Sequence, residues 1–331
     1  MKIAFFELKE WEKEILPGFA KKLKADIYPF EVEEDLKTAA EYEIISTFIY
    51  SDLSEKILKK LPKLKMIAAR STGYDHIDLN YCKKKKIIVA NVPSYGENTV
   101  AEHAFALILA LSRRIVEGAD RVKQGSFSPS GLTGFDLKGK TLGVVGVGSI
   151  GQWVVKYAKA FGMKVLGVTR QDHEKLEKRL GYKRVPLEIC LEQADIVTLH
   201  VPYLKTTHHL INKNNIKRMK KGSLLINTAR GPVVETESIL WALEQKILAG
   251  AGLDVLEEEE NLDDPQALFS GYISNDDLKE LVAVHLLREK PNVIITPHNA
   301  FNSKEAVERI AQTTFENIQA FLAGKPENLV G

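Results

Sequence analysis

The segment that decides the fold reads Gly146-Val147-Gly148-Ser149-Ile150-Gly151, a GxGxxG motif. It follows the apolar run Leu142–Val145 and opens a helical pattern over Gln152–Phe161. Gly146 permits a tight turn, Gly148 lets a pyrophosphate approach the backbone, and Gly151 lets the helix pack closely on the strand. Since the free N–H groups at a helix N-terminus attract phosphate, this strand–turn–helix order predicts a dinucleotide-binding site. An ordinary glycine-rich turn of an α/β protein is the alternative.

A regular alternation of strands and helices extends from this motif toward the C-terminus. The strand candidates are Leu142–Val147, Lys164–Val168, Ile196–Val201, Ser223–Asn227, Gly250–Val255 and Val293–Thr296. Six such strands with helices between most of them are typical of the nucleotide-binding doubly wound sheet. The segment Glu257–Pro291, helical over Asp276–Arg288, is interpreted as an excursion from this sheet.

The first hundred residues alternate in the same way and predict a second parallel sheet with helices on both faces. Its strand candidates are Ile3–Phe6, Ile27–Phe30, Ile44–Ile49, Met66–Ala69 and Ile87–Val92. Helical patterns cover Trp11–Leu23, Glu55–Leu61, Ala101–Arg114 and Ser303–Leu322. The stretch Gln124–Lys140, rich in glycine, serine and proline, is typical of a boundary between folded parts. The predicted fold class is therefore α/β, with two doubly wound parallel-sheet domains.

Composition limits the partners and the compartment. The chain has 331 residues, which predicts two domains at about 150 residues each. Lys and Arg number 46 against 44 Asp and Glu, so neither a nucleic acid nor a membrane surface is an expected partner. The two cysteines, Cys82 and Cys190, exclude a disulfide scaffold and give no zinc-binding spacing, so we expect no metal. Without a recognisable signal peptide or membrane span, a cytoplasmic protein is expected.

The residue that selects the ribose of the cofactor is expected about 20 residues after the glycine motif, where an acid binds the 2′-hydroxyl. The sequence has Thr169 and Arg170 at this point. A hydroxyl and a guanidinium suit a 2′-phosphate better than an unmodified ribose, which predicts tolerance of NADP(H) as well as NAD(H). Two alternatives stay open: Asp172 takes over the role of the acid, or Arg170 is a solvated charge stacked on the adenine.

Three strands of the second series are followed by residues that suit the reduction of a 2-oxo acid, namely Arg230, Glu259 and His298. Ligands bind at the carboxyl ends of the strands in an open parallel sheet, so these side chains should face one crevice. A guanidinium grips the substrate carboxylate, an imidazole donates a proton to the carbonyl oxygen, and a carboxylate stabilises the imidazolium. The alternatives are a surface salt bridge, a core or capping histidine, and a solvated acidic face.

Several ordered motifs over nearly the whole chain resemble the D-isomer-specific 2-hydroxyacid dehydrogenase family. Besides the glycine motif they are Thr72-Gly73-Tyr74-Asp75-His76-Ile77-Asp78, Asn91-Val92-Pro93-Ser94-Tyr95, Ala101-Glu102-His103, His200-Val201-Pro202, Asn227-Thr228-Ala229-Arg230-Gly231, Gly252-Leu253-Asp254-Val255 and Thr296-Pro297-His298. The resemblance implies a flavodoxin-like substrate domain at residues 1–100 and 299–331 and a Rossmann dinucleotide-binding domain at residues 101–298, with the active site in the cleft between them.

The resemblance also implies the roles of individual residues. Arg230, Glu259 and His298 match the catalytic residues, and Glu259 is chosen within Glu257–Glu260 because it lies five residues after Asp254. The implied substrate-binding residues are Thr72, Gly73, Tyr95 and Phe301. The implied cofactor-binding residues are Gly146, Gly148, Ser149, Ile150, Gly151, Thr169, Arg170, Val201, Pro202, Thr207, Thr228, Ala229 and Asp254. Asp254 would hold the nicotinamide carboxamide.

Oligomeric state and substrate follow from the same resemblance. A homodimer through Ala101–Arg114 is expected, because this helix is apolar over most of its circumference; burial within one chain is the alternative. Three features are most similar to D-lactate dehydrogenases, namely His298-Asn299-Ala300-Phe301, Tyr95 and the long segment after Glu260, so D-lactate and pyruvate are the predicted pair. A glyoxylate or hydroxypyruvate reductase is the first alternative, which Thr169 and Arg170 fit. A non-enzymatic dinucleotide-sensing protein on the same fold is the second, disfavoured because no partner-binding extension is recognisable.

Overall fold

The protein is described by a computed structural model that covers residues 1–170, 174–257, 259 and 275–331. The chain separates into two compact units, one formed by Met1–Gly96 with Phe301–Gly331 and the other by Glu97–Ala300. The expected boundary at Gln124–Lys140 is wrong, because this stretch lies inside the second unit. Its glycine and proline residues belong to the irregular connection that follows a surface helix.

The first unit is built on a five-stranded parallel sheet with the order β2-β1-β3-β4-β5. This order is that of flavodoxin-like folds, in which the order of the strands in the sheet reverses between β1 and β3. The strands are β1 (Ile3–Phe5), β2 (Asp26–Ile27), β3 (Ile44–Thr47), β4 (Met66–Ala69) and β5 (Ile88–Ala90). Strands are present at all five expected places, and most are one to three residues shorter than their apolar runs. β2 is also displaced and shares only Ile27 with the expected strand Ile27–Phe30.

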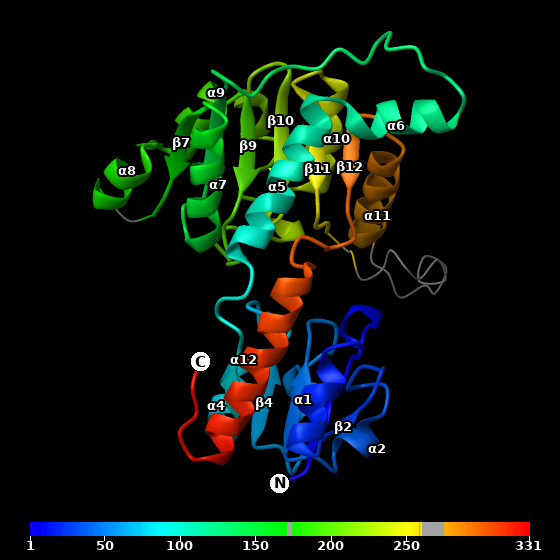
Figure 1. The fold of residues 1–331 in the computed structure, drawn as a ribbon, viewed down its shortest axis with the longest axis vertical. Helices are drawn as coiled ribbons and strands as arrows, with labels where there is room; N and C mark the ends of the chain where they lie inside the picture. The colour runs from blue at the N-terminus through cyan, green and yellow to red at the C-terminus, as the bar shows by residue number, and fades with distance from the viewer. Residues whose placement is uncertain (171–173, 258, 260–274) are drawn as a thin grey trace. The chain divides into compact units, whose positions relative to one another are not determined.

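Helices cover both faces of this sheet, and the C-terminal helix returns to it (Figure 1). They are η1 (Glu10–Glu12), α1 (Leu16–Leu23), α2 (Leu36–Ala39), α3 (Glu55–Leu58), α4 (Leu79–Lys85) and α12 (Lys304–Leu322). α12 packs beside α1, and its Ala311 and Ile318 join the core over that face. The expected single helix over Trp11–Leu23 is wrong: a short 3₁₀ turn precedes α1, which begins at Leu16 with Pro17 in its first turn, where proline is favoured.

The second unit contains a seven-stranded parallel sheet with the order β12-β11-β10-β9-β6-β7-β8. Counted from β6, the first six positions follow the Rossmann order 3-2-1-4-5-6, and β12 adds a further strand. The strands are β6 (Thr141–Val145), β7 (Lys164–Val168), β8 (Lys183–Arg184), β9 (Ile196–Leu199), β10 (Ser223–Asn227), β11 (Leu248–Leu253) and β12 (Val293–Ile295). The six expected strands are present, and the short edge strand β8 was not predicted.

Helices also cover both faces of the second sheet, with α5 and α7 together on one of them (Figure 1). Val144 and Ile226 point to this face, whereas their neighbours Val145 and Leu225 point to the face covered by α9, α10 and α11. The helices are α5 (Glu97–Ser112), α6 (Ile115–Lys123), α7 (Ser149–Ala160), α8 (Glu174–Leu180), α9 (Leu187–Gln193), η2 (Ile216–Arg218), η3 (Gly231–Val233), α10 (Thr236–Glu244) and α11 (Asn275–Arg288).

The apolar helix α5 is used mainly within its own unit. A Cβ atom on Gly252 of β11 would lie 3.0 Å from Cβ of Leu107, and one on Gly250 would lie 3.2 Å from Cδ2 of Leu111. The two glycines therefore let α5 sit directly on the sheet. None of the helices in the described ranges combines the length and the apolar character that crossing a bilayer requires.

Candidate active site

The glycine motif forms a tight turn between β6 and α7. Gly146 has a φ of +96°, in the left-handed region, and a Cβ there would lie 2.4 Å from the carbonyl oxygen of His200. A Cβ on Gly151 would lie 2.1 Å from the Gly146 oxygen, so both positions require glycine. Gly148 is the N-cap of α7, and nothing lies within 4 Å of its missing Cβ. Ser149, Ile150 and Gly151 thus form a helix start that is open to a ligand.

Two buried polar atoms near this turn fit a bound dinucleotide. Oγ1 of Thr228 and Nδ1 of His200 are buried and have no hydrogen-bond partner among the described residues. His200 follows β9, which pairs with β6 in the sheet, and Thr228 follows β10, the next strand beyond β9. Buried polar atoms are usually paired, so these two agree with a ligand bound at this edge of the sheet. Ala229, beside Thr228, is also buried.

The loop after β9 carries the expected residues Val201, Pro202 and Thr207. Oγ1 of Thr207 donates to the carbonyl oxygen of Pro202 at 2.7 Å and accepts from the amide of Leu204 at 2.7 Å, which closes the loop. Burial lowers the pKa of His200, at the base of this loop, to about 3. His200 is therefore neutral at physiological pH and adds no charge beside a dinucleotide.

Thr169 and Arg170 directly follow β7, where the ribose-selecting acid was expected. Arg170 is exposed and Thr169 is partly buried. Asp172, the alternative acid, lies outside the described residues.

His298 follows β12 in a left-handed conformation with a φ of 47°. Its amide donates to the carbonyl oxygen of Asp254 at 2.9 Å, and its Nδ1 atom lies 2.8 Å from Oε1 of Glu259. A carboxylate only accepts hydrogen bonds, so Nδ1 carries a proton and Nε2 is the ring nitrogen for exchange with a substrate. The left-handed backbone and the hydrogen bond to Glu259 together fix the imidazole.

Asp254, the expected carboxamide ligand, lies under the turn that bears His298. Its buried carboxylate accepts hydrogen bonds from the amides of Asn299 and Ala300, at 2.8 and 2.9 Å, and from Oγ1 of Thr296 at 2.5 Å. Because the Thr296 hydroxyl donates to Asp254, Nε2 of His103 at 3.0 Å must donate to Thr296. Asp254 thereby ties α5 and β11 to the loop after β12.

Arg230 follows β10 in a turn held by Asn227. The Asn227 amide donates to the carbonyl oxygen of Arg230 at 2.9 Å, and its Oδ1 accepts from the amide of Ala229 at 3.0 Å. A Cβ on the next residue, Gly231, would lie 1.9 Å from the carbonyl oxygen of Leu256. The backbone that leads to Glu259 therefore passes directly against the Arg230 turn. The structure brings the surroundings of all three expected catalytic residues together at one edge of the sheet.

The expected substrate-binding residues lie in the first unit. Oγ1 of Thr72, next to Gly73, donates to the carbonyl oxygen of Val92 at 2.7 Å and joins the loops after β4 and β5. Tyr95 packs in an apolar cluster that contains Phe301, Phe48 and Trp11. The Phe301 ring centroid lies 5.1 Å from those of Trp11 and Phe48, so Phe301 is anchored by aromatic contacts on two sides.

Several residues with structural roles at this site were not predicted. They are Glu257, His209, Thr236, Asn227, Thr296 and His103. Most of their partners lie far away in the sequence, although those of Asn227 are only two and three residues away. Asn227, Thr296 and His103 stand in the family-like motifs, but no role was assigned to them. Glu257 stood out only as a member of the acidic run.

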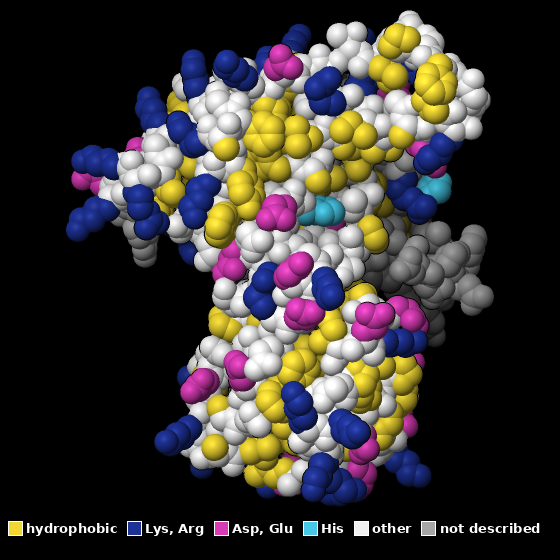
Figure 2. Space-filling view, in the orientation of Figure 1, with side chains coloured by type: hydrophobic (Ala, Val, Ile, Leu, Met, Phe, Trp, Pro, Cys, Tyr) yellow, Lys and Arg dark blue, Asp and Glu magenta, His cyan; other side chains and the backbone are white. Residues whose placement is uncertain are grey.

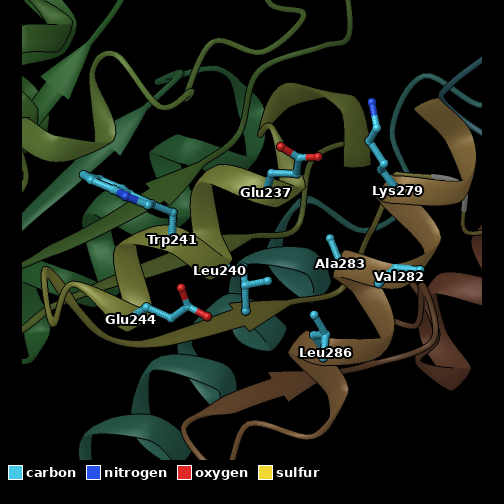
Figure 3. Close-up of a pocket in the computed structure, with 8 residues that line it drawn as sticks. All are labelled: Glu237, Leu240, Trp241, Glu244, Lys279, Val282, Ala283 and Leu286. Carbon is cyan, nitrogen blue, oxygen red and sulfur yellow. The ribbon is translucent and has the colours of Figure 1, made fainter. Parts of the chain in front are cut away.

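A separate pocket of about 470 Å³ lies between α10 and α11 (Figure 3). Leu240 of α10 and Ala283 and Leu286 of α11 point toward one another across it, with Trp241, Val282, Glu237, Glu244 and Lys279 around them. None of the expected site residues lines this pocket. Among the described residues, no group of three or more His, Cys, Asp or Glu side chains is arranged to hold a metal ion.

Comparisons with known proteins identify the family. The chain is 38% identical over 303 residues to a glyoxylate reductase of Thermococcus litoralis, covering 89% of this chain and 85% of that protein. It is 32% identical over 339 residues to a D-lactate dehydrogenase of Escherichia coli, and both chains are covered completely. The crystal structure of D-lactate dehydrogenase from Aquifex aeolicus complexed with NAD and lactic acid superimposes with a TM-score of 0.88 at 40% identity, covering 98% of this chain and 96% of that one.

Residues 105–300, which include the glycine motif and the three strand ends described above, match the NAD binding domain of one family. The cradle at Gly146–Gly151 and the unpaired buried atoms beside it agree with a nicotinamide dinucleotide as the cofactor. An oxidoreductase fold of two parallel-sheet domains, with this match and these relatives, places the chain in the D-isomer specific 2-hydroxyacid dehydrogenase family.

Proposed function

We propose that this protein interconverts a small D-2-hydroxy acid and its 2-oxo acid, with D-lactate and pyruvate as the preferred pair. The observation that carries the proposal is the 2.8 Å contact between His298 and Glu259, in the same unit as the Arg230 turn. An acid–base residue paired with a carboxylate and accompanied by a guanidinium is the set that reduction of a 2-oxo acid needs.

Each residue has a distinct part in the proposed reaction. Bound NADH or NADPH supplies the hydride that is added to C2 of the oxo acid. Arg230 binds the substrate carboxylate, and the protonated His298 donates the proton on Nε2 to the carbonyl oxygen as it becomes a hydroxyl. Glu259 accepts from Nδ1 throughout, so it orients the ring and stabilises the imidazolium. In the reverse direction, neutral Nε2 accepts the hydroxyl proton.

Similarity and residue chemistry both support pyruvate as the substrate. The Aquifex aeolicus enzyme, 40% identical, was solved with lactic acid. Tyr95 and Phe301, proposed to contact the substrate, belong to an apolar aromatic cluster that suits a methyl group better than a hydroxymethyl group. Glyoxylate is the second candidate, since the Thermococcus litoralis relative is a glyoxylate reductase.

The choice between the two dinucleotides is part of the proposal. Thr169 and Arg170 stand at the end of β7, where an acid would repel a 2′-phosphate. With a hydroxyl and an exposed guanidinium there instead, the protein is proposed to accept NADPH as well as NADH.

We also propose a cytoplasmic homodimer. α6 has no buried residue, and its Ile115, Val116 and Val122 are exposed together with Phe127, which is 88% accessible. Apolar side chains are visible around α6 and the segment after it in Figure 2. Exposed apolar side chains of this kind mark protein–protein contacts, so we propose that the dimer contact includes α6, which follows the expected helix α5 directly in the chain. The buried, unpaired thiols Cys82 and Cys190 suit a reducing compartment.

Steady-state kinetics with pyruvate, hydroxypyruvate and glyoxylate, each with NADH and with NADPH, test the proposed function. The expected result is the highest kcat/KM for pyruvate. A higher value for glyoxylate would assign the protein to the second candidate. Absence of activity with all three acids would contradict the proposal as a whole.

A further inference from the structure

Glu257 is a buried carboxylate beside the candidate active site that the proposed chemistry does not use. It is 4% exposed and lies two residues before Glu259. Its Oε2 atom accepts from the amide and from the hydroxyl of Thr236, both at 2.7 Å, and its Oε1 atom lies 2.6 Å from Nε2 of His209. A buried carboxylate is costly unless it is fully paired, and these three donors satisfy it.

His209 is held in turn by the segment that follows Arg230. Its amide donates to the carbonyl oxygen of Pro232 at 2.8 Å, and its φ of 46° places it in the left-handed region. The side-chain amide of Asn212 donates to the His209 carbonyl oxygen at 2.8 Å, and the ring stacks on that of His208 at 3.9 Å. Since Glu257 only accepts hydrogen bonds, Nε2 of His209 carries a proton.

These contacts connect three chain segments, each of which contacts the other two. The segment after β9 is bound to the segment after β10 through His209 and Pro232. The segment after β10 contacts the segment after β11 where Gly231 meets the carbonyl group of Leu256. The His209–Glu257 pair connects the segment after β9 to the segment after β11. Glu257 also accepts a hydrogen bond from the amide of Thr236, the first residue of α10.

We propose that the Glu257–His209 pair is a positioning device that holds the turn of Arg230 in register with Glu259. The inference rests on the proposed function, because it assigns Arg230 and Glu259 to the reaction. Neither Glu257 nor His209 needs to contact the substrate. They set the distance between Arg230, which binds the substrate carboxylate, and Glu259, which orients His298.

An amide at position 257 replaces the carboxylate poorly. The oxygen of Glu257→Gln can face Thr236, but its NH₂ group then faces Nε2 of His209, which can accept a hydrogen bond only if the ring proton moves to Nδ1. The hydrogen bond to a charged carboxylate is lost in either case, so the two segments are held together less tightly. Displacements of about 1 Å at such sites cost on the order of 100-fold in rate, so we expect kcat/KM for the oxo acid to fall by about 10- to 100-fold.

The histidine offers a matched pair of variants. His209→Gln keeps an N–H donor for Glu257, whereas His209→Leu removes the donor at similar volume. We expect His209→Gln to stay within about threefold of the wild-type kcat/KM and His209→Leu to fall as far as Glu257→Gln. Glu244→Gln, an exposed carboxylate at the far end of α10, is the control and should leave the kinetics unchanged.

A double-mutant cycle with Glu259→Gln separates positioning from general loss of structure. If Glu257 acts through Glu259, Glu257→Gln should lower kcat/KM by less than about threefold in the Glu259→Gln background. The dissociation constant of NADH, measured by fluorescence, should stay within about twofold of the wild-type value in all variants.

Three results would overturn the inference while leaving the proposed function intact. These are wild-type kcat/KM in Glu257→Gln, equal kcat/KM in the two His209 variants, and full multiplicative effects in the double variant. If Glu257→Gln does not fold, the two His209 variants decide alone. Failure of the proposed function is distinguishable, because the wild type itself would then reduce no 2-oxo acid.

Discussion

Nδ1 of His298 lies 2.8 Å from Oε1 of Glu259, although 39 residues separate the two along the chain. The contact is possible because β11 and β12 are parallel neighbours, so the segments that follow them leave the sheet at the same edge. The carboxylate of Asp254 fixes the turn after β12 by accepting hydrogen bonds from the amides of Asn299 and Ala300. The proposed acid–base group is therefore held at its ring by the Glu259 carboxylate and at its backbone amide by the carbonyl oxygen of Asp254.

The contact between Gly231 and Leu256 should be essential. A Cβ in Gly231→Ala would lie 1.9 Å from a carbonyl oxygen, and backbone cannot yield as a flexible side chain does. We expect the free energy of unfolding to fall by about 1–3 kcal/mol and kcat/KM to fall by on the order of 100-fold. Urea unfolding and steady-state kinetics measure the two effects.

The matched control for this variant is Gly18→Ala. Gly18 lies in α1 with nothing within 4 Å of its missing Cβ. Alanine there should raise the free energy of unfolding by about 0.5–1 kcal/mol. A Gly231→Ala protein as stable and active as wild type would show that the two segments do not meet as described.

The sequence predicted most strands and several single site residues. It did not predict some of the short elements beside the strands or the contacts that the site residues make. Lys164–Val168 and Ser223–Asn227 were predicted with the bounds found in the structure, because their apolar runs are sharply ended. β8, with two polar residues at the sheet edge, has no periodicity to detect. The start of α1 was missed although Pro17 signals it.

In the candidate site, too, single residues could be predicted from the sequence, whereas their contacts could not. Arg230 and His298 could be proposed from strand ends alone, because parallel strands expose their carboxyl ends at one edge. Glu259 could be chosen within Glu257–Glu260 only from its spacing to Asp254 in the family that the sequence resembles. The pairing of Glu257 with His209 could not be predicted, since it depends on how loops 48 residues apart meet in space. Tertiary contacts of this kind leave no pattern in local sequence.

The lowered pKa of His200 predicts a specific acid destabilisation. Burial lowers its pKa to about 3 in the folded protein, against about 6.5 in the unfolded chain. Between these values the unfolded state binds a proton and the native state does not, so the free energy of unfolding falls as the pH falls. From pH 7 to pH 5, this contribution amounts to about 2 kcal/mol.

The variant His200→Gln should lack this term. Between pH 7 and pH 5, the free energy of unfolding of the wild type should therefore fall by about 2 kcal/mol more than that of His200→Gln. His285→Gln, an exposed position on α11, is the control and should show no such shift. Parallel pH profiles of wild type and His200→Gln would contradict the burial of a neutral imidazole.

Cofactor preference should depend on the end of β7. Without an acid at Thr169, NADPH meets no like charge, so its kcat/KM should equal or exceed that of NADH. Thr169→Asp should restore preference for NADH by binding the ribose hydroxyl and repelling the phosphate. Rejection of NADPH by the wild type of a hundredfold or more, about 2.7 kcal/mol, would show that another residue selects NADH.

The proposed dimer predicts a mass of twice 37.0 kDa in sedimentation at micromolar concentration. Phe127→Asp should shift the protein toward the monomer, because it places a charge in the exposed apolar cluster at α6. The exposed Tyr50→Asp, in the first unit, is the control and should leave the mass unchanged. A wild-type monomer would refute the dimer.

The rate of hydride transfer in His298→Ala tests most directly whether this ring supplies the proton. If Nε2 of His298 supplies the proton, pre-steady-state reduction of pyruvate should slow by about 10²–10⁴-fold. The dissociation constant of NADH should stay close to the wild-type value, because the dinucleotide is held at the glycine motif and not by this ring. A rate near that of the wild type in His298→Ala would show that the His298–Glu259 pair does not perform the proton transfer.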